Sequence, residues 1–413
     1  MREKRTFMTD TRVRTAAPVI DWASDFDHTD PVWVDNPFPI WDDLRKRCPV
    51  AHSERYGGTY LPTRAEDIHA ISYDTEHFTS RHVVVGNGQR LAEAPIGGAP
   101  PITSDPPFHQ HARKILLPAF GPKVIEALRP RVVELCHKLI DEMQDRDVVD
   151  GAADYAQNIP PAVIAHMLGL PMEDGNIFRR FIHNALGNVD APAEEREAAF
   201  GELDYYLDAH LADHLDNPRE DLITFLQNAE IFENKLSPEH VRGTIALLLI
   251  AGIDTTWSAI GAALFHLAAN DSDRNRLRHE PQLLPTAVEE FLRAYAPVTM
   301  ARIVKEDVEI SGTVLKKGEW CLLPFPAANR DPEAFVDADQ FVIDRAENRH
   351  AAFGLGIHRC LGSNLARLEL SVGIQVWMER FPDFILEDPS AVTWAPGQVR
   401  GPRALPIRVL ERT

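Results

Sequence analysis

Residues 353–362 read FGLGIHRCLG, so three glycines surround one cysteine just before a predicted helix from Leu361 to Phe381. Glycine permits left-handed turns and lets a ligand come close to the backbone. A thiolate at a helix N-terminus is stabilised by the backbone N–H groups and the helix dipole. The segment therefore predicts an anionic sulfur ligand with a flat partner against the loop. The alternative is a buried structural cysteine in a glycine-rich turn.

The composition around this segment is that of a globular protein. The chain has 413 residues, of which 44% are hydrophobic and 25% charged, enough to bury a large core. Its 62 Asp and Glu against 43 Lys and Arg give a formal net charge of −19. Nucleic acids and anionic membranes attract a positive surface, so this charge argues against both as general partners.

Cysteine usage and the N-terminus indicate the compartment. The cysteines are Cys48, Cys136, Cys321 and Cys360, and no two of them form a CxxC pair. Such scattered cysteines favour neither a disulfide framework nor a structural zinc site. The first residues contain no apolar signal-peptide region, and the longest apolar run, Ile245–Ile250, is far below the roughly 20 residues of a membrane span. We therefore expect a cytoplasmic protein without a membrane span.

The order of turns and periodic segments indicates one large domain. Residues 1–35 read as a loosely ordered arm, and residues 36–413 as a single, mainly α domain with small β-sheets, an α+β fold. A serine, a proline and an acid at 237–239 predict the start of a long helix that runs to Asn270 and crosses the core. The other predicted elements are a hairpin over Val50–Pro62 with its turn at Gly57-Gly58, a surface loop over 86–107, helices over 109–180 interrupted at Pro160 and Pro161, a helix over Leu283–Ala296 and strands over 301–325.

Residues 251–256, AGIDTT, form an unusual cluster inside the long helix. A glycine within a helix costs up to about 1 kcal/mol relative to alanine. Thr255 can direct its hydroxyl to the carbonyl of Ala251, and Gly252 leaves room for a ligand beside the backbone. Asp254 and Thr255 would supply proton-carrying groups. A polar cluster at a packing kink is the alternative interpretation.

Taken together, these segments resemble the cytochrome P450 (haem-thiolate monooxygenase) family of the soluble bacterial type, over about residues 37–410. Residues 353–362 match its FxxGxxxCxG haem loop, and residues 251–256 its [AG]-Gly-x-Asp-Thr-Thr element. The resemblance implies a long central helix over haem b, with Cys360 as the axial ligand of the iron. It implies proton relay by Asp254 and protons or water held by Thr255. Residues implied to lie against the haem are Phe353 and Gly354 of the loop and Ala251 and Gly252 of the helix.

Two further motifs follow the family's order. Glu290 and Arg293, at i and i+3 on one helical face, match its ExxR element, whose third partner should be Arg345. We expect this trio to be structural rather than catalytic. Residues 105–113, DPPFHQHAR, match the DPPxHxxxR segment that binds the haem carboxylates. The implied partners of those carboxylates are His109, Arg113, Arg302 and His358.

The substrate pocket is predicted only by register with the family, and core packing would give the same apolar pattern. Leu247, Ile250 and Ala251 should face the distal side of the haem, with Val298 and Met300 opposite. The other expected contacts are Val84 and Val85 with the lid loop 86–102, and Gln398-Val399 from the C-terminal end.

The implied activity is insertion of one oxygen atom of O2 into a C–H bond of a small organic substrate, as hydroxylation or oxidative O-dealkylation. We find no flavin domain and no four-cysteine iron–sulfur pattern, so a separate ferredoxin and its NAD(P)H-dependent reductase should supply electrons. Cations near the haem loop, Lys114, Arg349, Arg359 and Arg367, are expected to be free to face that acidic partner. The alternative is that these cations are paired within the protein.

Three other functions compete with this interpretation. A peroxide-driven peroxygenase of the same fold would not need the pair Asp254 and Thr255. A non-catalytic haem sensor or carrier would need neither that pair nor a substrate lid. A zinc hydrolase built on His109 and His111 would need a further ligand that no HExxH or CxxC motif supplies.

Overall fold

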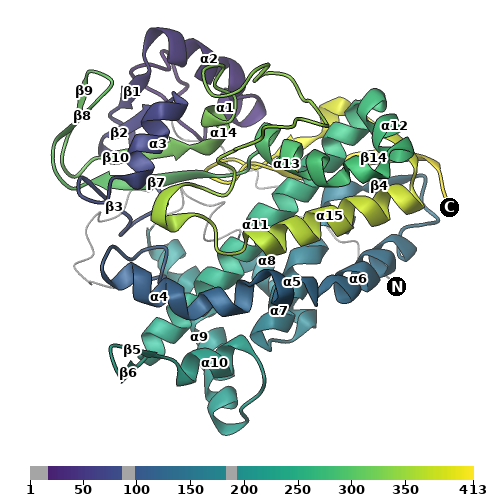
Figure 1. The fold of residues 1–413 in the computed structure, drawn as a ribbon, viewed down its shortest axis with the longest axis horizontal. Helices are drawn as coiled ribbons and strands as arrows, with labels where there is room; N and C mark the ends of the chain where they lie inside the picture. The colour runs from purple at the N-terminus through teal and green to yellow at the C-terminus, as the bar shows by residue number, and fades with distance from the viewer. Residues whose placement is uncertain (1–16, 86–97, 183–192) are drawn as a thin grey trace.

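The computed structural model describes residues 17–85, 98–182 and 193–413. A small sheet with the first helices occupies the upper left of Figure 1, and a larger helical part occupies the rest. The α-helices are α1 (Pro31–Asp35), α2 (Phe38–Arg47), α3 (Ala65–Tyr73), α4 (Phe108–Leu116), α5 (Pro122–Glu126), α6 (Arg129–Asp141), α7 (Ile159–Leu168), α8 (Gly175–Ile182), α9 (Ala193–Asp216), α10 (Leu222–Asn228), α11 (Pro238–Ala269), α12 (Asp271–His279), α13 (Leu284–Ala294), α14 (Phe325–Ala328) and α15 (Ser363–Arg380).

The strands are short and form several separate sheets. A five-stranded sheet has the order β1-β2-β10-β7-β3, with β10 parallel to β2 and its other pairs antiparallel, and a three-stranded sheet has the order β11-β14-β4. The strands are β1 (Val50–Ser53), β2 (Thr59–Pro62), β3 (Phe78–Thr79), β4 (Val148–Asp150), β5 (Glu230–Ile231), β6 (Asn234–Lys235), β7 (Thr299–Val304), β8 (Val308–Ile310), β9 (Thr313–Leu315), β10 (Trp320–Pro324), β11 (Asp383–Leu386), β12 (Thr393–Trp394), β13 (Pro402–Ala404) and β14 (Pro406–Glu411).

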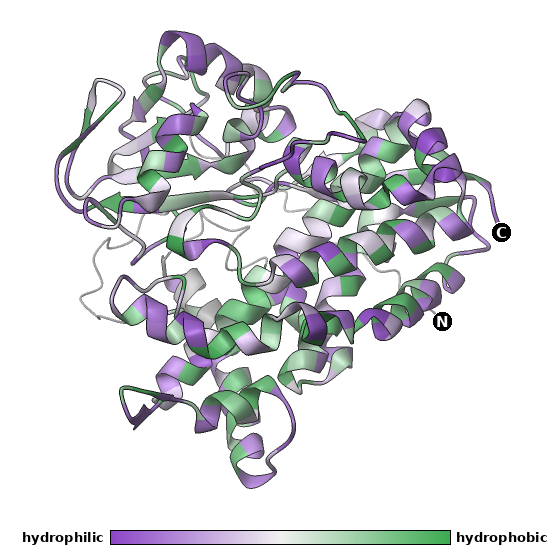
Figure 2. Ribbon diagram, in the orientation of Figure 1, coloured by the Kyte–Doolittle hydropathy of each residue, from purple (hydrophilic) through white to green (hydrophobic). Residues whose placement is uncertain are grey.

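Helix α11 is the predicted long helix, and it crosses the core. The Ser237 hydroxyl accepts from the N–H of His240 at 3.2 Å, and Pro238 occupies the first turn, which confirms the predicted start. In the part of the chain described, α11 alone is long and apolar enough to cross a membrane, but 67% of its most apolar window is buried inside the protein. It packs against α7 and α15, as expected of a core helix. Figure 2 shows the outer helix α6 with both hydrophobic and hydrophilic residues.

The expected mainly α fold with small sheets is confirmed, and so is the hairpin formed by β1 and β2. Pro160 and Pro161, expected to interrupt a helix, lie instead in the first turn of α7. Proline is tolerated there because the N–H groups of the first turn have no partner within the helix.

The expectation of a loose arm through residue 35 is wrong for residues 17–35, whereas residues 1–16 lie outside the described part. Phe26 and Trp33 are buried, and the ring of Trp33 meets that of Trp41 edge-on at 5.3 Å. The Arg55 guanidinium binds Asp25 at 2.7 Å and Asp27 at 2.9 Å. These long-range contacts fix the segment against the small sheet, and no local periodicity in the sequence predicts them.

Candidate active site

The loop 353–362 turns back on itself before α15. Gly354 and Gly356 have φ values of +70° and +68°, which favour glycine. A Cβ at Gly356 would lie 2.2 Å from the carbonyl oxygen of Ser72, so α3 packs directly against this turn. The N–H of Cys360 donates to the Phe353 carbonyl at 2.7 Å, which closes the loop. These contacts fix the position of the thiol.

Cys360 lies within the protein but opens onto an internal cavity. Burial raises the pKa of its thiol above the ordinary value, while a hydrogen bond with the backbone of Gly362 and the nearby charge of Arg113 lower it. Burial therefore outweighs the stabilisation that the sequence predicts for a thiolate near a helix N-terminus. A metal ion bound to the sulfur would reverse this balance, because a coordinating thiol is deprotonated.

One cavity lies between this loop, α11 and β7. It is lined by Leu247, Ala251, Gly252 and Thr255 of α11, by Val298, Met300 and Arg302 at β7, by Phe353, Gly354, His358 and Cys360 of the loop, and by His109 and Arg113 of α4. Side chains at i, i+2 and i+4 share a face of an extended strand, which explains why Val298, Met300 and Arg302 all face the cavity. Pro101, Ile102 and Ile164 also line it. Ile164 was not predicted, because nothing in α7 distinguishes it from a core residue.

Half of the predicted substrate contacts lie elsewhere. Leu247, Ala251, Val298 and Met300 line the cavity, whereas Val84, Val85, Ile250 and Val399 do not. Of the predicted lid, residues 86–97 lie outside the described part.

The structure shows where three of these four residues lie. Val85 is fully buried in the cluster around the five-stranded sheet, and its N–H donates to the Gln398 side chain at 2.5 Å. Val399 forms a β-bridge with Val298 and is buried, but it is not among the residues that line the cavity. Ile250 packs against the helical core.

The polar residues of α11 separate onto different sides. The Thr255 hydroxyl donates to the Ala251 carbonyl at 2.9 Å, as predicted, and Thr255 lines the cavity. The nearest atom to a Cβ at Gly252 would be 3.6 Å away on Ile164, so the protein itself leaves space there. Asp254 is only 2% exposed and does not line the cavity. Its carboxylate binds Arg403 of β13 at 2.6 Å, a partner that the sequence does not indicate.

Four basic side chains gather at one edge of the cavity: His109, Arg113, Arg302 and His358. The two imidazole rings are 4.3 Å apart, and none of the four groups forms an ion pair within the described residues. Both ring nitrogens of His109 and Nε2 of His358 are buried there without a hydrogen-bond partner. Burial lowers the pKa of His109 to about 4, of His358 to about 2 and of Arg302 to about 10. Buried polar groups without partners are costly, so this edge fits the carboxylates of a bound ligand.

The structure does not support a zinc site built on His109 and His111. The ring of His109 faces His358, whereas that of His111 packs on Phe232 at 4.3 Å. Within the described residues no group of three or more His, Cys, Asp or Glu could hold a metal ion.

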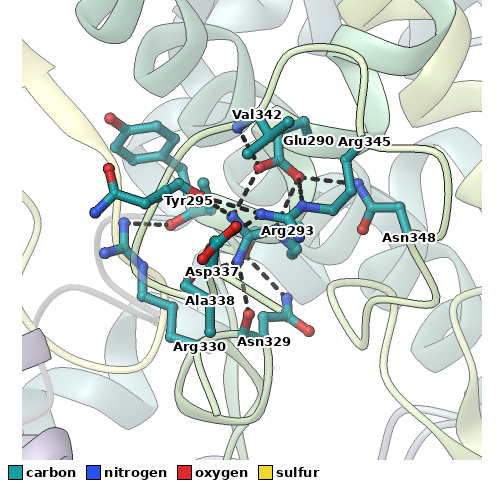
Figure 3. A network of polar contacts seen from close by, with 12 residues as sticks. Glu290, Arg293, Tyr295, Asn329, Arg330, Asp337, Ala338, Val342, Arg345 and Asn348 are labelled. Atoms are coloured by element: carbon teal, nitrogen blue, oxygen red, sulfur yellow. Dashed lines mark hydrogen bonds and ion pairs between the residues drawn. The ribbon is translucent and has the colours of Figure 1, made fainter. Parts of the chain in front are cut away.

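A buried ionic network supports the cavity from the side of α13 (Figure 3). Glu290 binds Arg293 at 2.7 Å and Arg345 at 3.0 Å, so the predicted trio is present. It also accepts from the N–H of Val342 and from the amide of Asn348. Arg293 donates to the carbonyls of Asn329, Ala338 and Gln340. The network therefore fixes the irregular stretch 329–350 that leads to the cysteine loop.

One of the cations expected to face a partner protein is already paired. Arg367 binds Glu289 at 2.6 Å, and its guanidinium lies 4.4 Å from the centre of the Phe353 ring. The expectation that Arg367 is free is therefore wrong. Lys114, Arg349 and Arg359 are exposed and form no ion pair within the part of the chain described.

Known proteins share this architecture. Residues 176–388 match the family described as Cytochrome P450. Mycinamicin IV hydroxylase/epoxidase of Micromonospora griseorubida is 33% identical over 379 residues, which cover 89% of this chain and 94% of that protein. The chain belongs to the cytochrome P450 family.

Other cytochromes P450 are similar to this chain over nearly its whole length. Nocardicin C N-oxygenase of Nocardia uniformis subsp. tsuyamanensis is 33% identical and covers 88% of this chain and 92% of its own. The solved structure of the bacillaene polyketide synthase cytochrome P450 PksS of Bacillus subtilis 168 has a TM-score of 0.85 at 30% identity, with 94% of this chain and 100% of that chain covered. The protein is thus a P450 monooxygenase whose cofactor is haem. The two buried histidines without hydrogen-bond partners and the cavity-facing cysteine fit that cofactor.

The Glu290 network gives a stability prediction. In Glu290→Ala, Arg293 would stay buried without its carboxylate, so we expect the free energy of unfolding to fall by about 3–5 kcal/mol. Denaturant unfolding of the haem-loaded protein measures this change. Asp344→Ala removes an exposed partner of Arg276 and serves as the control, because exposed ion pairs contribute little. Equal stability of the two variants would contradict a supporting role for the network.

Proposed function

We propose that this P450 hydroxylates or oxidatively O-dealkylates a small, mainly apolar organic substrate, with electrons from a separate ferredoxin and its NAD(P)H-dependent reductase. The observation that carries the proposal is the cavity, which has Cys360 on one wall and Thr255 on another, with Leu247, Val298 and Met300 among the apolar lining. Apolar pockets with few polar groups are typical of small-molecule sites. Related proteins include a hydroxylase/epoxidase and an N-oxygenase, which supports the oxygenase class but not one substrate.

The proposal assigns roles to particular side chains. Haem, when bound, supplies the activation of O2. The Cys360 thiolate would hold the iron, and His109, Arg113, Arg302 and His358 would hold the two carboxylates. Thr255 would hold a proton or a water molecule at the cavity wall, and Asp254 behind it would relay protons from solvent. A peroxygenase would not need these last two groups.

Substrate class is tested by titrating the purified haem protein with terpenes, fatty acids, methoxyarenes and methyl sugars. Displacement of water from the iron changes the spectrum from low spin to high spin. The apolar lining predicts responses to some members of the first three classes, followed by formation of hydroxylated or dealkylated product. A response to methyl sugars alone would contradict the proposed apolar substrate.

Ligation by Cys360 is tested by spectroscopy. The reduced protein with carbon monoxide should absorb at the long wavelength diagnostic of thiolate ligation, and Cys360→His should lose this band. Cys321→Ala is the matched control, because Cys321 is fully buried in the five-stranded sheet and lies outside the cavity lining. If Cys360→Ala keeps the band and Cys321→Ala loses it, the assignment is wrong.

The role of Thr255 is tested by measuring how much product forms for each electron consumed. Thr255→Ala should still consume reduced nicotinamide through the partner proteins, but release more hydrogen peroxide and less product, because proton delivery at the cavity wall is disturbed. Asp254→Asn should turn over more slowly, since an amide cannot relay a proton. Thr244→Ala is the control, because Thr244 lies on the same helix outside the cavity lining. Equal product per electron in wild type and Thr255→Ala would remove Thr255 from the mechanism.

Electron delivery is tested through charge. Arg113 donates to the Arg359 carbonyl at 2.5 Å, so α4, with the exposed Lys114, lies against the cysteine loop. Steering by these cations predicts that reduction by an acidic ferredoxin slows as salt rises, and that Lys114→Glu and Arg359→Glu weaken association. Lys138→Glu on α6 is the control: it makes the same charge change outside this group of cations, so it should leave association unchanged. A salt-insensitive rate that neither reversal changes would place the partner elsewhere.

A further inference from the structure

Arg403 links Asp254 to the surface from a distant part of the chain. Its NH2 group donates to Oδ1 of Asp254 at 2.6 Å, and its NH1 group donates to the Ser258 hydroxyl at 3.0 Å. The guanidinium also lies over the Trp257 ring, 5.1 Å from its centre. One forked side chain therefore holds two polar groups that are one turn apart on α11.

The C-terminal segment is pressed close to α11 at this point. A Cβ at Gly401 would lie 2.2 Å from that of Ser258, so only glycine permits this approach. Pro402 packs against Gly261, and the N–H of Leu405 donates to Asp150 at 3.0 Å. The backbone on both sides of Arg403 is thus fixed, which orients its side chain toward α11.

Burial differs sharply between the two partners. The side chain of Asp254 is 3% exposed, whereas that of Arg403 is 28% exposed. A buried carboxylate is costly unless it is paired, and a nearby cation favours its charged form. A guanidinium does not act as a proton carrier in proteins, so Arg403 can act on proton transfer only through its position and charge.

We propose that Arg403 is a positioning residue for proton transfer, which holds the Asp254 carboxylate ionised and oriented behind Thr255 at the point where solvent reaches α11. In this form Asp254 accepts a proton from solvent and releases it toward Thr255, returning to the ionised state. The inference rests on the proposed roles of Asp254 and Thr255. It adds a third residue, from β13, to that pair.

The test compares Arg403→Gln, Arg403→Lys, Asp254→Asn and the double variant Arg403→Gln/Asp254→Asn in the complete system with ferredoxin and reductase. We expect Arg403→Gln to lower turnover about tenfold with KM nearly unchanged, and to raise the solvent isotope effect, because proton delivery becomes slower. Arg403→Lys keeps the charge but cannot donate to Asp254 and Ser258 with the planar geometry of a guanidinium, so its turnover should be intermediate. In the Asp254→Asn background, Arg403→Gln should cause no further loss, since it acts through Asp254.

Arg400→Gln is the matched control. Arg400 lies in the same segment and stacks on Trp394 at 3.9 Å, but its hydrogen bonds go to the carbonyls of Val34 and Asp35 rather than to α11. It should keep the wild-type isotope effect even if it lowers stability. If Arg403→Gln does not accumulate as a haem protein, the same comparison is made with Arg403→Lys, alone and combined with Asp254→Asn.

The outcomes separate this inference from the proposed function. Wild-type turnover in Asp254→Asn would refute the proton relay itself. Slow turnover in Asp254→Asn, with Arg403→Gln unchanged or with additive losses in the double variant, would leave the relay standing and overturn the role of Arg403.

Discussion

The gathering of buried basic side chains at the edge of one cavity is the constraint on which the site depends. His109, Arg113, Arg302 and His358 lie at its edge without an ion-pair partner in the described residues, and the Cys360 thiol opens onto the same space. An interior that leaves such groups unpaired is costly. Haem offers two carboxylates and a metal ion, so one ligand satisfies both requirements. The fold keeps these groups in register through the Glu290 network and through the close contact of Gly356 with α3.

Features that depend on local geometry could be predicted from the sequence. The glycines around Cys360 take positive φ values, Ser237 caps α11, and Thr255 donates to the carbonyl four residues earlier. Each follows from the preference of one residue type for one backbone environment. The trio Glu290, Arg293 and Arg345 required the family motif as well, because a pair at i and i+3 is ordinarily found on a helix surface.

The remaining features depend on contacts between distant segments. Arg367 is paired with Glu289, Val85 is buried under the small sheet, and Asp254 faces Arg403 from β13. Apolar residues in a pocket wall and in a core have the same pattern in sequence, so Val298 and Val399 could not be told apart. The pairing of Asp254 with Arg403 spans 149 residues, so no local pattern in the sequence of α11 indicates it.

A crystal structure of the purified holoprotein tests most directly whether haem, bound through Cys360, pairs with the basic side chains of this cavity. We predict an iron–sulfur bond to Cys360 and haem carboxylates in hydrogen-bond contact with His109, Arg113, Arg302 and His358. Iron ligated by another side chain, or carboxylates that leave these four groups unpartnered, would contradict it.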